Sequence, residues 1–146
     1  MKKARLQKVV DHLRKVRVQI ALSKLPEFRM ADWAVLEEPG VFKEKKNLSC
    51  MTSACAIGHA AHLFKKQGFK LVIMGEESNK LVPVYRGKEM FDAVSEFFDL
   101  TDEEAEYLFH PIRYNDSYPT VSEVADRIED FIHGIYDFNS FTGEKG

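Results

Sequence analysis

The sequence is poor in the residues that characterise several classes of protein. It has two cysteines, Cys50 and Cys55, and a single tryptophan among its 146 residues. A bridge between cysteines this close together would close only a very small loop, so the fold does not depend on disulfides. The longest apolar runs, such as residues 71–74, are far too short to cross a bilayer. Disulfide-stapled and membrane-spanning proteins are therefore excluded.

We expect no secretory leader, and the sequence shows no internal repeat, linker or low-complexity segment. Its first residues carry interleaved charges in place of the uninterrupted apolar core of a secretory signal. We expect a cytoplasmic protein with no membrane association. We also expect one domain over residues 1–146, with a frayed tail after about residue 138.

The charges are divided between the two ends of the chain. Residues 1–25 contain eight lysines and arginines and one acidic residue, whereas residues 87–138 contain fourteen acidic residues and three basic ones. The net charge of −2 hides this division. The two ends can pair within the fold, in a head-to-tail oligomer or with a partner, and the sequence sets neither this choice nor the oligomeric state.

The first residues predict an amphipathic helix from about residue 4 to residue 24, ended by Pro26. Its opposite face carries Arg5, Lys8, His12 and Lys15. We interpret this stripe as a solvated face, with nucleic-acid contact as the alternative. No aromatic residue interleaves it, so we do not expect nucleic acid as a partner. The apolar positions recur every three or four residues and are Leu6, Val9, Val10, Leu13, Val16 and Ile20.

Residues 69–74 and 81–85 predict a β-hairpin, because both are rich in β-forming residues and flank a polar turn. Pro83 predicts an edge position for the second strand. Trp33 is interpreted as a core anchor. The predicted fold class is α+β, mainly helical, with about five helices packed around a small antiparallel β-hairpin.

Three helices are predicted after the hairpin, the first from about residue 88. Thr101 with Glu104, and Thr120 with Glu123, have the spacing of capping boxes and predict where the other two begin.

The most distinctive segment is residues 50–62, which holds both cysteines and two of the five histidines. Thr52, or Ser49 before it, predicts the N-cap of a helix that runs to about Gln67, with Gly68 as its stop. The side chains of this helix are small, which lets a neighbouring backbone approach closely.

Two kinds of thiol or metal chemistry are compatible with this segment. Cys50, Cys55, His59 and His62 are residue types that bind zinc, although their spacing is not that of the common structural zinc sites. Cys50 alone, at a helix N-terminus, is the one candidate for a catalytic nucleophile. The surrounding residues match no catalytic-cysteine signature.

A third interpretation is an anion or nucleotide site, and a fourth is packing alone. Ser49, Thr52 and Ser53 can hold a phosphate with the backbone N–H groups of a helix start. Together with Cys50 and His59 they form the predicted ligand-binding set. In the packing interpretation, which we favour, the cysteines act as small buried hydrophobes. We predict no cofactor and no resident metal.

The other histidines are His12, His110 and His133, and none has a companion at ligand spacing. We interpret each as a partly exposed or hydrogen-bonded residue. If Cys50 is a nucleophile, His110 or His133 is the candidate base.

Two longer motifs are Cys-x-Thr-x-x-Cys-x-x-Gly-His-Ala at residues 50–60 and Leu-Thr-x-x-Glu-Ala-x-x-Leu-Phe-x-Pro at residues 100–111. With shorter matches over about residues 4–134, the chain resembles a family of small uncharacterised proteins encoded by bacteria and their phages. The common form has Gly after the first cysteine, where this chain has Met51. The resemblance implies no catalytic residue, because the family has no agreed activity.

We therefore expect a small, non-enzymatic binding or interaction protein, encoded by a phage or mobile element and located in the host cytoplasm. Its partner is expected to be a host protein or a small anionic ligand. The alternatives are a hydrolase or transferase that uses Cys50, and a protein that contacts nucleic acid through its basic N-terminal helix.

Overall fold

The computed structural model describes most of the chain. The residues it describes are 1–22, 27–28, 30, 33–36, 51–73, 80–114 and 119–138. These residues form five α-helices and a six-stranded sheet, so the predicted α+β class is confirmed. The predicted frayed tail after residue 138 lies outside them.

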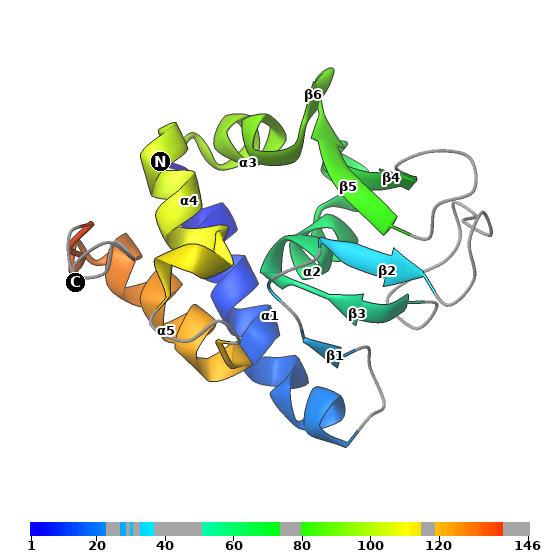
Figure 1. Cartoon of the computed structure of the whole chain (residues 1–146). Coiled ribbons are helices and arrows are strands. Elements are labelled where there is room, and N and C mark those ends of the chain that lie inside the picture. Colours follow the sequence, from blue (N-terminus) through cyan, green and yellow to red (C-terminus); the bar gives the residue numbers. More distant parts are fainter. Residues whose placement is uncertain are drawn as a thin grey trace.

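The first and last helices of the chain lie side by side. In Figure 1, α5 runs along α1, and α2 lies between α1 and the sheet. Two short 3-10 turns, η2 (Lys65–Gln67) and η3 (Pro111–Arg113), follow α2 and α4. The helices are α1 (Lys3–Ala21), α2 (Ala56–Leu63), α3 (Met90–Phe98), α4 (Asp102–Phe109) and α5 (Val121–Ile132).

The sheet is larger than the hairpin that the sequence predicts. Its strand order is β1-β3-β2-β5-β4, and β6 also pairs with β5. The β1–β3 pair is parallel and the others are antiparallel. The strands are β1 (Glu27–Phe28), β2 (Ala34–Leu36), β3 (Met51–Ala54), β4 (Lys70–Ile73), β5 (Lys80–Tyr85) and β6 (Lys88–Glu89).

The predicted hairpin is present as β4 and β5, in which Val72 pairs with Val82. The edge position predicted from Pro83 is wrong, because β5 also pairs with β2 and β6. These two partners leave a gap on that side of β5. The β2 pairs end at Leu81 and the β6 pairs begin at Val84, so Pro83 falls where neither strand needs an N–H donor.

The start of the second predicted helix is also wrong. Residues 51–54 form β3, and α2 begins at Ala56 with Cys55 as its N-cap. The reason is tertiary: β3 has β1 on one side and β2 on the other, so its backbone groups find ladder partners. The predicted stop is confirmed, since Gly68 ends η2 in a left-handed conformation with φ of 91°.

The local helix signals are otherwise confirmed. The predicted apolar face of α1 is buried from Leu6 to Val16, and Ile20 packs at the edge of the core. In both predicted capping boxes the threonine hydroxyl accepts from the third helical N–H at 3.1 Å, and the glutamate accepts from the threonine N–H. These boxes involve Thr101 with Glu104 and Thr120 with Glu123.

The buried hydrophobic residues form one core cluster to which all five helices contribute. Phenylalanines are the largest of its fully buried side chains; Phe69, for example, stacks on Phe97 with ring centroids 4.6 Å apart. Trp33 is only partly buried, but packs against this cluster and meets Phe91 edge-on at 4.9 Å. None of the helices in the described ranges is long and apolar enough to cross a membrane.

Gly58 allows α2 to lie against the backbone that leads into β2. A Cβ atom at this position would be 3.0 Å from the Cβ of Ala54 and closer still to the carbonyl oxygen of Trp33. That oxygen is held in place, because it accepts from the Cys55 N–H at 3.1 Å. The close packing predicted for the small-residue helix is therefore present at Gly58.

We expect Gly58→Ala to lower the free energy of unfolding by about 2–3 kcal/mol, because the added methyl group overpacks a contact with backbone that has little room to move. Urea unfolding measures this loss. Gly68→Ala is the control: nothing lies within 4 Å of its Cβ position, so only left-handed backbone strain of about 1 kcal/mol is expected. Equal stability of Gly58→Ala and the unmodified protein would contradict the close contact.

Candidate functional site

The structure describes only part of the predicted site. Ser49 and Cys50 lie outside the described residues, and Thr52 and Ser53 belong to β3 rather than to a helix start. The helix terminus on which the phosphate interpretation depended is therefore at Cys55. The roles predicted for Ser49, Cys50, Thr52 and Ser53 stay predictions.

The remaining members of the predicted zinc set lie on or next to α2. Cys55 is 1% exposed and His59 is fully buried, whereas His62 is exposed. Among the residues that the structure describes, no group of three or more histidine, cysteine or acidic side chains is arranged to hold a metal ion. The zinc hypothesis thus has no assembled ligand set in this part of the chain.

A residue that the sequence left without companions completes a different site. His12 on α1 faces α2, with its Nε2 atom 3.0 Å from the Nδ1 atom of His59. The His12 ring is also 6.2 Å from that of His62, measured between centroids. We call these three residues the histidine cluster. The interpretation of His12 as a partly exposed or hydrogen-bonded residue is confirmed, but its partner could not be predicted from spacing along the chain, because the two helices meet only in the fold.

The contact between His12 and His59 is a hydrogen bond between neutral rings. One of the two facing nitrogens must carry the proton, since two bare lone pairs at 3.0 Å would repel each other. The other nitrogen of His59, Nε2, is buried and has no hydrogen-bond partner among the described residues. The ring of Phe28 lies 6.1 Å from His59 on its β1 side. An unpaired buried polar atom costs about 1–3 kcal/mol, so this position destabilises the closed packing.

The electrostatics of the cluster keep it uncharged near neutral pH. Burial, followed by the proximity of His62 and Lys15, lowers the pKa of His12 to about 4. Burial, followed by the proximity of His12 and His62, lowers the pKa of His59 to about 3. Burial and Lys65 also lower the pKa of His62. Among the described residues, the groups that act on these rings are therefore cations or other imidazoles.

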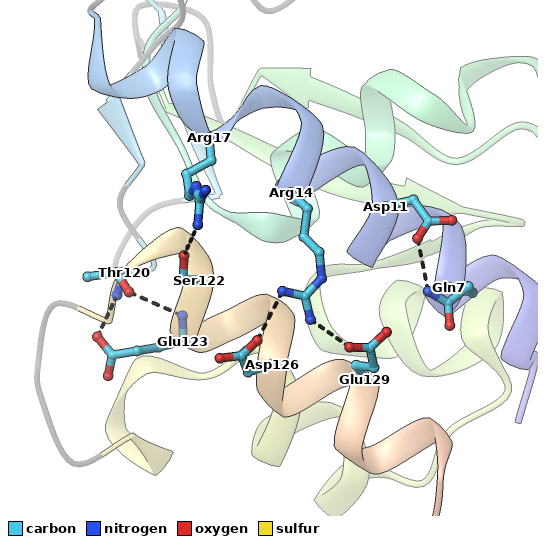
Figure 2. Close-up of polar contacts among 9 residues, drawn as sticks. All are labelled: Gln7, Asp11, Arg14, Arg17, Thr120, Ser122, Glu123, Asp126 and Glu129. Atoms are coloured by element: carbon cyan, nitrogen blue, oxygen red, sulfur yellow. Dashed lines mark hydrogen bonds and ion pairs between the residues drawn. The ribbon is translucent and has the colours of Figure 1, made fainter.

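The basic residues of α1 divide into arginines, which make contacts within the fold, and exposed lysines. Figure 2 shows Arg14 reaching two carboxylates of α5, Asp126 at 3.0 Å and Glu129 at 2.7 Å. Arg17 donates to the hydroxyl of Ser122, on the same helix, at 3.3 Å. The pairing of opposite ends within the fold, one of the three options that the sequence leaves open, is therefore realised between α1 and α5.

The predicted solvated stripe of α1 is correct for only half of its members. Arg5 donates to the carbonyl oxygen of Phe97 at 2.6 Å and lies over its ring, 4.1 Å from the centroid. His12 belongs to the histidine cluster. Lys8 and Lys15 are exposed, and within the described ranges no ion pair engages them.

These lysines share a side of α1 with two exposed apolar residues. Lys8, Lys15, Val18 and Leu22 follow at helical intervals, so they lie on one face, opposite the buried one. Val18 is 55% and Leu22 61% exposed. We call these four residues the α1 outer face. It combines two cations with an apolar patch at the C-terminal end of the helix.

A cavity of about 400 Å³ lies where the start of α1 meets the end of α5. This volume is in the range of small-ligand pockets. Its lining includes the cationic Lys3 and the apolar Phe131. The other lining residues are Met1, Ile132, His133, Gly134 and Tyr136.

The two candidate base residues lie in ordinary settings. His110 stacks on Phe91 at 5.5 Å, and its Nδ1 atom accepts from the Ile112 N–H at 3.2 Å. His133 is exposed at the C-cap of α5. Both fit the sequence interpretation of partly exposed or hydrogen-bonded residues.

Comparison of the chain with protein-family models, with curated proteins and with solved structures finds no match. The resemblance to a family of small bacterial and phage proteins therefore stays a prediction.

We expect Arg14→Ala to lower the free energy of unfolding by about 0.5–1 kcal/mol, because one guanidinium serves two partly exposed carboxylates. The loss should shrink in 0.5 M NaCl, where surface pairs are screened to within about 3–5 Å. Urea unfolding at both salt concentrations is the measurement. Lys8→Ala, on the same helix, is the control and should change stability by less than about 0.5 kcal/mol. Losses that are equal in the two variants would remove the role of the α1–α5 pairing.

We expect stability to fall as the pH is lowered from 7 to 5. The folded pKa of His59 lies below its ordinary value of about 6.5, so below that pH the unfolded chain takes up a proton that the folded chain refuses. His59 alone then removes up to about 1.4 kcal/mol per pH unit, and the less buried His12 adds a smaller amount. Urea midpoints at pH 7, 6 and 5 measure the change. His59→Leu should flatten this profile, and His133→Gln should leave it unchanged; a profile of the unmodified protein that is already flat would refute the effect.

Proposed function

We propose that this chain is a non-enzymatic interaction protein that binds an acidic surface of a partner protein through the α1 outer face. One observation carries the proposal: the arginines of α1 are engaged within the fold, while Lys8 and Lys15 point outward beside Val18 and Leu22. In the part of the chain that the structure describes, no ion pair uses these lysines, which supports a role for them in contact with a partner.

The α1 outer face has the composition of a small binding surface. Exposed apolar side chains such as Val18 and Leu22 lose water when a partner covers them, at roughly 25 cal/mol per Å² of buried apolar area. Lysines at the edge of such a patch act mainly on the rate and the specificity of association. A single helix face of this size suits a transient complex rather than an obligate one.

The partner is a protein rather than a nucleic acid. Nucleic-acid binding depends on many Lys and Arg contacts to phosphates, and here the arginines of α1 already have partners. The acidic α5 lies beside α1 and would repel an extended polyanion. A short acidic segment of a protein avoids this repulsion, because it covers only the outer face.

The resemblance to phage and bacterial proteins supports an origin in a phage or mobile element, with a host protein as the partner in the host cytoplasm. The Cys50 enzyme remains the alternative prediction, since Cys50 lies outside the described residues.

The test uses an immobilised short acidic peptide, hexa-L-glutamate, as a model acidic partner, at about 50 mM NaCl, where the Debye length is about 14 Å. We expect the unmodified protein to be retained, and Lys8→Glu/Lys15→Glu to elute in the flow-through. Lys66→Glu/Lys70→Glu is the matched control: it makes the same change of net charge at exposed lysines outside α1 and should be retained.

Two results would reject this proposal. If both double variants lose retention equally, net charge and not the α1 outer face is responsible. If the unmodified protein is retained on duplex DNA under the same conditions and not on the hexa-L-glutamate peptide, the nucleic-acid alternative is correct.

A further inference from the structure

We propose that the His12–His59 pair is an acid-sensitive lock: proton uptake at mildly acidic pH opens the seam between α1 and α2, while α1 stays in place on α5. This device is separate from the binding role of the α1 outer face. It would give the fold a second, partly open state whose population is set by pH.

The lock depends first on where the pair lies. His12 belongs to α1 and His59 to α2, and their 3.0 Å contact is the one hydrogen bond that joins these two helices in the part of the chain the structure describes. A first proton adds to the outer bare nitrogen of the donor ring and leaves the hydrogen bond in place, whereas a second proton takes the acceptor lone pair and leaves the N–H groups of two cations facing each other. The polar link across the seam would thereby become a repulsion.

Among the residues that the structure describes, the surroundings of the pair offer no negative charge to stabilise an added proton. On α1 the charged group acting on it is Lys15, and on α2 it is His62, behind which lies Lys65 of η2. On β1 the neighbour of His59 is the ring of Phe28. The acidic residue next to His12 in the chain, Asp11, is exposed and accepts a hydrogen bond from Gln7 instead. A protonated pair is therefore relieved only by water, which requires the seam to open.

The other attachments of α1 do not weaken over the same pH range. They consist of arginine bonds to carboxylates and a hydroxyl of α5, and of bonds from Arg5 and the Lys2 N–H to backbone carbonyls of Phe97 and Phe98. Aspartate and glutamate ordinarily titrate near pH 4, and arginine stays charged. Between pH 6 and 5 α1 therefore loses its hydrogen bond to α2 and keeps its contacts with α5 and α3.

The unpaired Nε2 atom of His59 favours the same opening. In the closed state this nitrogen is buried without a hydrogen-bond partner among the described residues. Water that enters the seam would supply the missing hydrogen bond. Opening this seam therefore costs less free energy than opening an interface whose polar atoms are all paired.

Cys55 is a suitable reporter, because it is buried one helical turn before His59. In a Cys50→Ser background, its labelling by 4,4′-dithiodipyridine is compared with labelling of the urea-unfolded protein at the same pH. If opening takes up two protons, the relative labelling rate should rise by up to about 100-fold per pH unit between pH 6 and 5. His12→Gln should reduce this slope to about tenfold per pH unit, since one proton remains.

The variant His12→Leu/His59→Leu should label at a rate independent of pH after the same normalisation, and His133→Gln should behave as the Cys50→Ser background does. If the double leucine variant does not fold, the slopes of His12→Gln and His133→Gln still decide the matter. A slope that His12→Gln leaves unchanged would overturn the proposal.

Two further readouts separate the lock from global unfolding and from metal binding. Hydrogen exchange in α5 should stay slow at pH 5 while Cys55 becomes accessible; if α5 opens to the same extent, the unfolding is global and the proposal is wrong. Addition of one equivalent of Zn²⁺ at pH 7 should not raise the melting temperature. A rise that EDTA reverses would assign the histidine cluster to metal binding instead.

Discussion

The packing of α1 on three of its sides is the constraint on which the rest of the structure depends. One side is buried in the core, a second carries Arg14 and Arg17 against α5, and a third carries His12 against α2. Only the outer face remains for solvent or a partner. Substitutions on different sides of α1 therefore affect different neighbours, although all of these residues belong to one continuous helix.

The division of arginine and lysine on α1 follows from the different physical properties of the two side chains. The planar guanidinium of Arg14 can serve two carboxylates at once, and that of Arg5 can stack on a ring while it donates to a carbonyl. The ammonium of Lys8 or Lys15 is a strongly hydrated point charge and is better placed in water. The charge asymmetry of the chain thus has two consequences: it joins the ends of the fold, and it leaves a small cationic surface.

The histidine cluster is a different kind of constraint, because it stabilises the fold only while it is uncharged. Burying two imidazoles in contact, with no carboxylate of the described ranges acting on them, makes the α1–α2 seam depend on pH in a range where most side chains do not change their charge. The tight approach of α2 to the Trp33 backbone at Gly58 has no such dependence. The two sides of α2 therefore respond differently to acid.

The sequence by itself determined the features that depend on neighbours within a few residues. The apolar spacing of α1, both capping boxes, the β4–β5 hairpin and the stop at Gly68 are set by helical and strand periodicity and by local hydrogen bonds. Tertiary structure alone decided the rest. Met51–Ala54 became a strand because β1 and β2 lie on either side of it, and Pro83 occupies a central strand because its partners leave a gap there. His12 is hydrogen-bonded to His59, 47 residues further along the chain. Local spacing cannot encode this contact, because it depends on how two helices pack.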